Sequence, residues 1–386
     1  GRNAWRLRDG QWTKLTPQHG EGWQSIAIEP HAPEHICLGN LAGNIDQSFD
    51  GGDTWTGFYP SAPERAFTDI PWLAWTMEDW FSNANMTFDP VEPNTLWCAQ
   101  GIGVWRTNPK RSAARPKWEE LSRGIDELIV NTVLKPPGGP LVIACQDRAF
   151  FKLQDPDRYP SVHGPARDAP IRHGWGLDYA TDDPSFIVGV AGDKSGFSQD
   201  GGATWTPFAS LPSGDIHWGG GAIAAASRKN FVWFPANNRW PHFTRDGGFS
   251  WSACKFPSPL AEMTKAPGWA FSFYTNRHIL CVERSTGFYY AYNYEAWSPA
   301  DIAGVWRSTD GGESWRRMGR GFGVHGSMGT GAKLVSVPGY PGHLLFAVGA
   351  TEEAHPYNAS VYRTQDGGAS WRPIPGFVEN WTVGVG

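Results

Sequence analysis

Short apolar runs recur along the chain in a pattern that predicts β-strands separated by turns. A first run rich in β-branched residues, such as SIAIEP at 25–30 or KLVSVP at 333–338, meets a proline-containing turn. A second apolar run follows, as in HICLGN at 35–40, and a third comes after a loop, as in GVWRS at 304–308. Because no stretch sustains the 3.6-residue period of an amphipathic helix, the pattern favours an all-β chain over an α/β fold.

An octet of similar sequence follows the third run of several units. It occurs as SFDGGDTW at 48–55, SQDGGATW at 198–205, TRDGGFSW at 244–251, STDGGESW at 308–315 and TQDGGASW at 364–371. Its glycines supply the positive-φ positions of a hairpin turn, and its aspartate can accept hydrogen bonds from backbone N–H groups. The octet, identified as the Asp-box motif, is predicted to join the third and fourth strands and to pack its Trp between units. One repeated turn cannot form a single asymmetric active site, so we expect a structural role.

The runs and octets define repeat units of about 55 residues. The long interval between Trp55 and Trp205 has room for two degenerate units, which are predicted to end in KWEEL at 117–121 and DPDRYPSV at 155–162. Seven such units predict a seven-bladed β-propeller with four antiparallel strands in each blade.

We expect residues 1–386 to form this propeller as a single domain. Residues 4–15 resemble the last two strands of a blade and residues 380–386 a first strand, so strands from both termini would close the ring. Alternatively, both ends belong to further blades. The chain starts at Gly1 without Met or a signal peptide, so we expect that upstream sequence has been removed or left out.

Composition narrows the classes of partner and cofactor. A net charge of −5 without a Lys/Arg run argues against a nucleic-acid partner, and no apolar run reaches the length of about 18 residues that a membrane span needs. The 5 cysteines have no CxxC spacing and lie mostly in apolar runs, which predicts buried free thiols. HExxH, GxSxG and glycine-rich phosphate loops are absent, and the histidines are scattered. We therefore expect no cofactor and no metal; the oligomeric state stays open.

Candidate binding residues gather in the loops that a propeller would place on the face opposite the octets. These loops run from the second to the third strand and from one blade to the next, and their sequences need not repeat. Aromatic rings among hydrogen-bonding groups suit the apolar faces of sugars, so the predicted partner is a polysaccharide or oligosaccharide. The candidate substrate-binding residues are Trp23, Trp75, Arg172, His173, Trp175, His217, Trp218, Trp240, Tyr294 and Trp297.

The order of these stretches resembles glycoside hydrolase family 74, the xyloglucan-active endo-β-1,4-glucanases and their relatives. The resemblance is carried by residues 1–17, 22–40, 88–108, 124–151, 288–297, 304–315, 338–348 and 361–386. The family has two tandem seven-bladed propellers with a cleft between them, whereas this chain has the form of one. The resemblance implies a secreted or periplasmic glycoside hydrolase that cleaves a β-glucan or xyloglucan-like polysaccharide with inversion.

The resemblance also implies a general acid. The family's acid is an Asp that follows a PP-G-PL strand, and Asp147 in CQDRAFF matches it, although Arg148 and Ala149 replace the usual following residues. The family's base would fall at or before Gly1, outside this chain. An inverting pair needs two carboxyl groups roughly 6.5–9.5 Å apart. Asp193, in the corresponding loop of the next unit, is the internal candidate, unless it is an exposed loop carboxylate beside Lys194.

Two other functions remain open on the residues alone. A polysaccharide lyase acting on a uronate could use His173, His217 or His325 as base and Arg172 or Arg239 to neutralise the carboxylate. A propeller without catalytic activity could bind a glycan or a protein. The fold itself does not decide among these functions.

Overall fold

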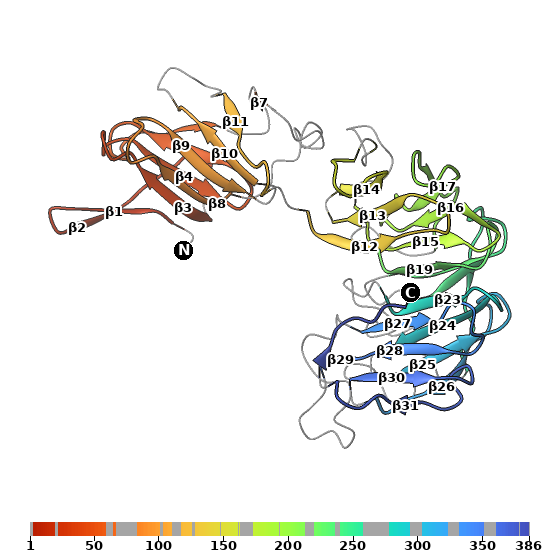
Figure 1. Cartoon of the computed structure of the whole chain (residues 1–386). Helices are drawn as coiled ribbons and strands as arrows, with labels where there is room; N and C mark the ends of the chain where they lie inside the picture. Colours follow the sequence, from red (N-terminus) through yellow and green to blue (C-terminus); the bar gives the residue numbers. More distant parts are fainter. Residues whose placement is uncertain are drawn as a thin grey trace. The chain divides into compact units, whose positions relative to one another are not determined.

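The computed structural model describes residues 3–19, 22–58, 65–66, 83–100, 103–109, 117–125, 128–146, 148–160, 162, 173–192, 194–212, 220–235, 240–257, 278–293, 303–322, 332–350, 360–377 and 379–385. These residues form strands and turns, with no helix among them, so the prediction of an all-β chain is confirmed (Figure 1). It follows that the described residues contain no apolar helix of membrane-spanning length. The chain divides into two compact units, Gly1–Leu128 and Ile129–Gly386.

The first unit consists of a hairpin and two larger sheets. The hairpin pairs β1 (Trp5–Arg8) with β2 (Gln11–Lys14). The next sheet has the order β3 (Trp23–Ile28), β4 (Ile36–Asn40), β5 (Ile45–Ser48) and β6 (Thr56–Phe58). The last contains β8 (Asn83–Phe88), β9 (Leu96–Gln100), β10 (Gly103–Thr107) and β11 (Trp118–Glu120), with β7 (Arg65–Ala66) added parallel to β11.

The second unit begins with a three-stranded sheet and continues with four-stranded ones. The first sheet is β12 (Val130–Leu134), β13 (Leu141–Cys145) and β14 (Arg148–Leu153). The second sheet is β15 (Leu177–Ala180), β16 (Asp183–Gly189), β17 (Gly196–Ser198) and β18 (Thr206–Pro207), and the third is β19 (Ala222–Ala225), β20 (Phe231–Phe234), β21 (His242–Thr244) and β22 (Ser252–Ala253). The fourth sheet is β23 (Leu280–Glu283), β24 (Phe288–Asn293), β25 (Gly304–Ser308) and β26 (Arg316–Gly319). The last sheet is β27 (Lys333–Ser336), β28 (Leu344–Ala347), β30 (Val361–Thr364) and β31 (Arg372–Pro373).

These sheets have the build of propeller blades. Apart from the added strand β7, neighbouring strands in each larger sheet are antiparallel and follow chain order. In the second unit the first strands β12, β15, β19, β23 and β27 lie beside one another (Figure 1). Every sequence repeat that contains an octet forms the predicted four strands. In the degenerate repeat that starts at β12, the described residues contain one bridge, between Lys152 and Val162, where the fourth strand was predicted. The count of seven blades and the closed ring stay predictions.

The octet is a hairpin turn between the third and fourth strands, as predicted. In the copy at 308–315, the Ser308 hydroxyl donates to Asp310 Oδ1 (2.8 Å), and the backbone N–H of Ser314 donates to the same oxygen (2.9 Å). Gly311 and Gly312 have φ of 76° and 94°. Hydrogen bonds from within the turn therefore satisfy the Asp310 carboxylate, which supports a structural role for the octet.

The octet tryptophans pack between neighbouring sheets. Trp315 is 3% exposed and lies against Phe234 of the preceding sheet and Phe256. Trp205 lies against Phe150 in the same way, with ring centroids 4.2 Å apart. The core of the second unit thus sits between successive sheets, and the prediction for these rings is confirmed.

The two ends of the chain make different contacts with the rest of the protein. In the first unit, Arg6 of β1 donates to the carbonyl oxygen of Gly51 in the next octet (2.6 Å), as Arg307 of β25 does to Gly367 (3.1 Å). The hairpin β1–β2 therefore contacts the next sheet as the last two strands of a blade do. In the second unit, β32 (Glu379–Asn380) pairs with β29 (Gly349–Ala350). Closure of the ring by both termini stays a prediction.

Candidate functional site

The segment 173–176 joins the ends of two neighbouring sheets in the second unit. The Gly174 N–H donates to the Cys145 carbonyl oxygen at the end of β13 (2.8 Å). The Trp175 N–H donates to the Val190 carbonyl oxygen, and the Val190 N–H donates back to Gly176 (both 2.9 Å). These bonds tie the end of β13 to the end of β16, on the side of the sheets opposite the octets.

Two side chains of β12 hold the same segment from the other side. Asn131 Nδ2 donates to the Gly174 carbonyl oxygen, and the Thr132 hydroxyl donates to the Trp175 carbonyl oxygen, both at 2.7 Å. Gly174, Trp175 and Gly176 are all buried. The backbone of this segment is therefore fixed by three strands from two sheets.

The turn after β16 is held by a buried hydroxyl. Ser195 Oγ accepts a hydrogen bond from the Ala191 N–H and donates to the Gly192 carbonyl oxygen, both at 2.8 Å. Ser195 is fully buried, and its hydroxyl group provides a hydrogen-bond partner for two backbone groups of the turn.

Most of the predicted site residues lie outside the described residues. This applies to both catalytic candidates and to six of the substrate-binding candidates, namely Asp147, Asp193, Trp75, Arg172, His217, Trp218, Tyr294 and Trp297. It also applies to Arg239 and His325 of the lyase alternative. The strands that lead to Asp147 and Asp193 are described, and the 173–176 segment connects them.

The remaining candidates are described and are largely packed into the protein. Trp23 on β3 is 7% exposed, and Trp175 is 6% exposed within a hydrophobic cluster that includes Trp233. Trp240 is partly buried, donates from Nε1 to the Cys254 carbonyl oxygen (2.7 Å) and packs edge-on against Phe256. His173 is partly exposed. Sugar contacts by these four residues stay predictions.

A histidine–aspartate pair in the first unit was not among the candidates. His19 Nδ1 lies 2.5 Å from Asp46 Oδ1, and the His19 N–H donates to Asp46 Oδ2 (2.8 Å). The Asp46 side chain is fully buried, whereas the imidazole is partly exposed. Gly57 is needed beside it, because a Cβ there would overlap the imidazole ring. No sequence signal pointed to this pair, since the residues are 27 positions apart.

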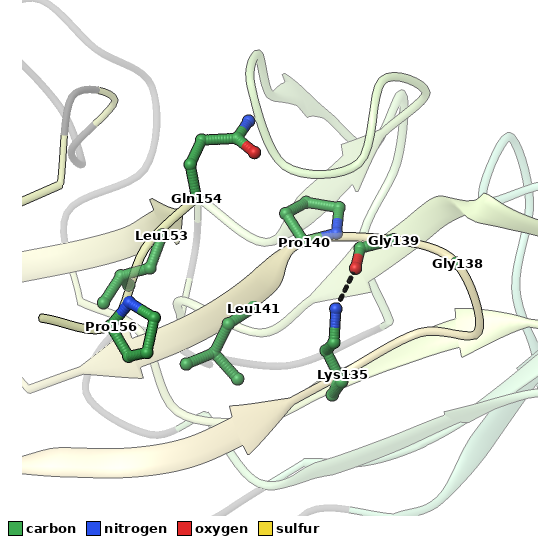
Figure 2. Close-up of a pocket in the computed structure, with 8 residues that line it drawn as sticks. All are labelled: Lys135, Gly138, Gly139, Pro140, Leu141, Leu153, Gln154 and Pro156. Carbon is green, nitrogen blue, oxygen red and sulfur yellow. Dashed lines mark hydrogen bonds between the residues drawn. The ribbon is translucent and has the colours of Figure 1, made fainter.

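A cavity of about 540 Å³ lies at the other end of the β12–β14 sheet (Figure 2). Its lining contains no carboxylate or imidazole, and its cation, Lys135, is bonded to the Gly139 carbonyl oxygen. It is lined by Lys135, Gly138, Gly139, Pro140, Leu141, Leu153, Gln154 and Pro156. Because the cavity lacks groups for acid–base chemistry and adjoins the octet side, we do not assign the site to it. Over the residues that the structure describes, no three His, Cys, Asp or Glu side chains are grouped to bind a metal.

Comparison with known proteins finds xyloglucanases by sequence and a similar fold by structure. No protein-family model matches the chain. It is 28% identical over 293 residues to a xyloglucanase of Acetivibrio thermocellus, covering 65% of this chain and 34% of that protein. It is 25% identical over 478 residues to the oligoxyloglucan-reducing end-specific xyloglucanase of Emericella nidulans, covering 93% and 57%.

The solved structures agree on the fold. The chain aligns with the crystal structure of the glycoside hydrolase family 74 enzyme of Niastella koreensis with a TM-score of 0.63 and 20% identity, over 96% of this chain and 50% of that one. The chain thus spans between about a third and somewhat over half of the length of these relatives. The comparisons confirm the resemblance of this chain to the xyloglucanase-like enzymes of glycoside hydrolase family 74.

Proposed function

We propose that this chain acts as a glycoside hydrolase on xyloglucan or a related β-glucan. The observation that carries the proposal is the similarity to xyloglucanases, which extends over 65% of the chain in one relative and 93% in another. A polymeric glycan is found outside the cytoplasm, so the proposed location is extracellular or periplasmic. The seven repeat units are proposed to form seven blades around one axis.

The proposed chemistry is hydrolysis by two carboxyl groups. Asp147 is the proposed general acid: it donates its proton to the glycosidic oxygen as the bond to the anomeric carbon breaks. A second carboxylate accepts a proton from water, whose oxygen attacks the anomeric carbon from the opposite face. Asp193 is the proposed internal base. The backbone bonds from the 173–176 segment to Cys145 and Val190 support the pairing, because they join the strands that lead to these two residues.

The test is the release of reducing ends from xyloglucan by the wild-type chain and by Asp147→Asn. We expect the variant to lose activity by a factor of about 10²–10⁴ while keeping its thermal midpoint, because general acid catalysis contributes about this much to a rate. Asp310→Asn is the matched control, since Asp310 anchors an octet turn and should alter stability rather than chemistry. Unchanged activity in Asp147→Asn would exclude Asp147 as the acid.

The same assay separates the alternatives. A lyase would release products with the ultraviolet absorbance of an unsaturated uronate from uronate polymers. A binding protein would retain xyloglucan without releasing reducing ends. Either result in place of xyloglucan hydrolysis would contradict the proposed function.

A further inference from the structure

The first glycine of an octet holds the octet turn against the turn between the first and second strands of the same sheet. In four of the five octets, the N–H of this glycine donates to a carbonyl oxygen of that other turn, at 2.8–3.0 Å. The bonds run from Gly51 to Glu34, from Gly201 to Ser185, from Gly247 to Lys229 and from Gly367 to Gly342. In each sheet the carbonyl belongs to the residue two positions before the strand partner of the first octet residue. The bond therefore has a fixed place in the repeat.

The β12–β14 sheet cannot form this bond. Leu153 pairs with Leu141 in the way that the first octet residue pairs in the other sheets. The same register places Pro156 at the position of the glycine and Gly139 at the position of the carbonyl. Because proline has no N–H group, the usual donor is missing, and the Lys135 ammonium group donates to the Gly139 carbonyl oxygen in its place. An exposed side chain thus replaces a backbone donor.

The cavity of about 540 Å³ lies where these two turns are not joined (Figure 2). Its lining residues all belong to 135–141 and 153–156, which are the two turns and the strand ends beside them. The space beside Gly138 is open, since a Cβ added there would meet nothing within 4 Å. Small-molecule sites have volumes of about 300–1,000 Å³, so the cavity is large enough to hold a ligand.

The cavity combines hydrogen-bonding groups with an apolar wall. The Gly139 carbonyl oxygen has a further lone pair and the Lys135 ammonium group has further N–H donors, so both can bond a ligand. The exposed Gln154 amide also lines the cavity and adds donors and an acceptor. The apolar wall consists of Pro140, Leu141, Leu153 and Pro156. Sugars suit this arrangement, because each hydroxyl group both donates and accepts while the ring carbons present an apolar face.

We propose that this cavity is an accessory binding site for a neutral oligosaccharide. A sugar hydroxyl group donates to the Gly139 carbonyl oxygen, as the octet glycine does in the other sheets, and accepts from Lys135. The sugar ring packs on the wall formed by Leu141 and Leu153. The site lies at the end of β13 and β14 away from the 173–176 segment. The proposal rests on the proposed function only in its choice of a glucan-type sugar.

The test is a titration of the full chain, with its leucine methyl groups labelled for NMR, by a neutral xyloglucan heptasaccharide. The methyl signals of Leu141 and Leu153 report on the cavity wall. Lys135→Met removes the charged donor. Lys152→Met is the matched control, because Lys152 is an ammonium group of the same sheet that bonds the Asp200 carbonyl oxygen and does not line the cavity.

A second variant closes the cavity and keeps Lys135. Leu153→Ser/Pro156→Gly/Asp157→Gly restores the hydroxyl group and the two glycines of an octet, so the N–H at position 156 can donate to Gly139 as in the other sheets. The thermal midpoint of each variant shows that it is folded. A parallel titration with an oligogalacturonate tests whether the site takes an anion instead.

We expect the heptasaccharide to shift the Leu141 and Leu153 signals of the wild type and of Lys152→Met, with the same Kd. Lys135→Met should raise Kd about tenfold, because it removes a hydrogen bond from a charged donor. The Leu141 signal of the triple variant should not shift. The titration needs no catalysis: if the wild type binds the heptasaccharide through Lys135 but releases no reducing ends, the proposed hydrolase fails and the accessory site stands.

Four results would overturn the proposal. The first is that the heptasaccharide shifts neither leucine signal of the wild type. The second is an equal rise of Kd in Lys135→Met and Lys152→Met, which would mean that the cavity cation has no specific role. The third is a Leu141 shift that persists in the triple variant, which would place the sugar outside the cavity. The fourth is tighter binding of the oligogalacturonate than of the heptasaccharide, which would make the site an anion site.

Discussion

Arg307 on β25 donates from Nη1 to the carbonyl oxygen of Gly367, in the octet turn of the following sheet, at 3.1 Å. The same contact recurs at other junctions: Arg245 reaches Asp310 (2.7 Å) and Lys152 reaches Asp200 (3.1 Å). A cation on the third strand of a sheet, or directly after it in the case of Arg245, thus binds the backbone of the octet turn in the next sheet. These bonds hold successive sheets together at the end opposite the 173–176 segment.

Replacing Arg307 with Met should loosen one of these junctions. The variant keeps much of the aliphatic stem but loses a charge-assisted hydrogen bond, which is worth about 1.5–3 kcal/mol. We expect the thermal midpoint to fall by a few degrees, measured by circular dichroism or calorimetry. Arg316→Met is the control, because Arg316 is exposed on the neighbouring strand β26. An equal effect of both substitutions would mean that the contact contributes nothing specific.

The octet aspartates should make stability depend on acid pH. Hydrogen bonds from the Ser250 side chain and backbone lower the pKa of Asp246 from 3.8 to about 2, and Ser370 does the same for Asp366. Since these pKa values are lowered on folding, the stabilisation is complete above pH 3.8 and is lost as the pH falls towards 2. The thermal midpoint of the wild type should decline across this interval. In Asp246→Asn/Asp366→Asn the decline should be shallower, and an identical slope would contradict the assignment.

The octet turn could be predicted from sequence because all its partners are local. In the copy at 308–315, Ser308, Asp310 and Ser314 bond one another within a few residues, so composition and spacing suffice. The four-strand pattern was predictable for a similar reason, since each strand pairs with its neighbour in the chain.

The candidate site could not be predicted in this way. Asn131 and Gly174 are 43 residues apart, and the bond between them depends on how two sheets pack. Trp175 was predicted to bind sugar because it lies in a loop from one blade to the next. In the structure Gly176 packs closely against the Gly221 carbonyl oxygen, Gly220 packs against the Trp175 side chain, and the ring is buried. A glycine-rich context indicates either an open loop or a close approach, and only tertiary contacts distinguish them.

The cysteines should be unreactive in the native protein. All five are free; four are buried and Cys281 is partly exposed. Burial raises the pKa of Cys145 and of Cys281 to about 12, and thiol reagents attack the thiolate. Titration with a disulfide reagent at pH 8 should therefore give slow or negligible reaction in buffer and five thiols in denaturant. Fast reaction of the native protein would contradict the packing of these strands.

Gly220→Ala tests whether Trp175 must be buried for the 173–176 segment to hold its position. A Cβ at Gly220 would overlap the Cβ and ring of Trp175, and the backbone there is held by a bond from Trp233 Nε1 to the Gly220 carbonyl oxygen (2.7 Å). Overpacking of this kind costs about 1–3 kcal/mol, so we expect a lower thermal midpoint and faster amide hydrogen exchange at Trp175 and Val190. Gly384→Ala is the control, because nothing lies within 4 Å of a Cβ added there. If the Gly220 variant keeps both its midpoint and its exchange protection, Trp175 is free to move, and a sugar-binding role for its ring regains support.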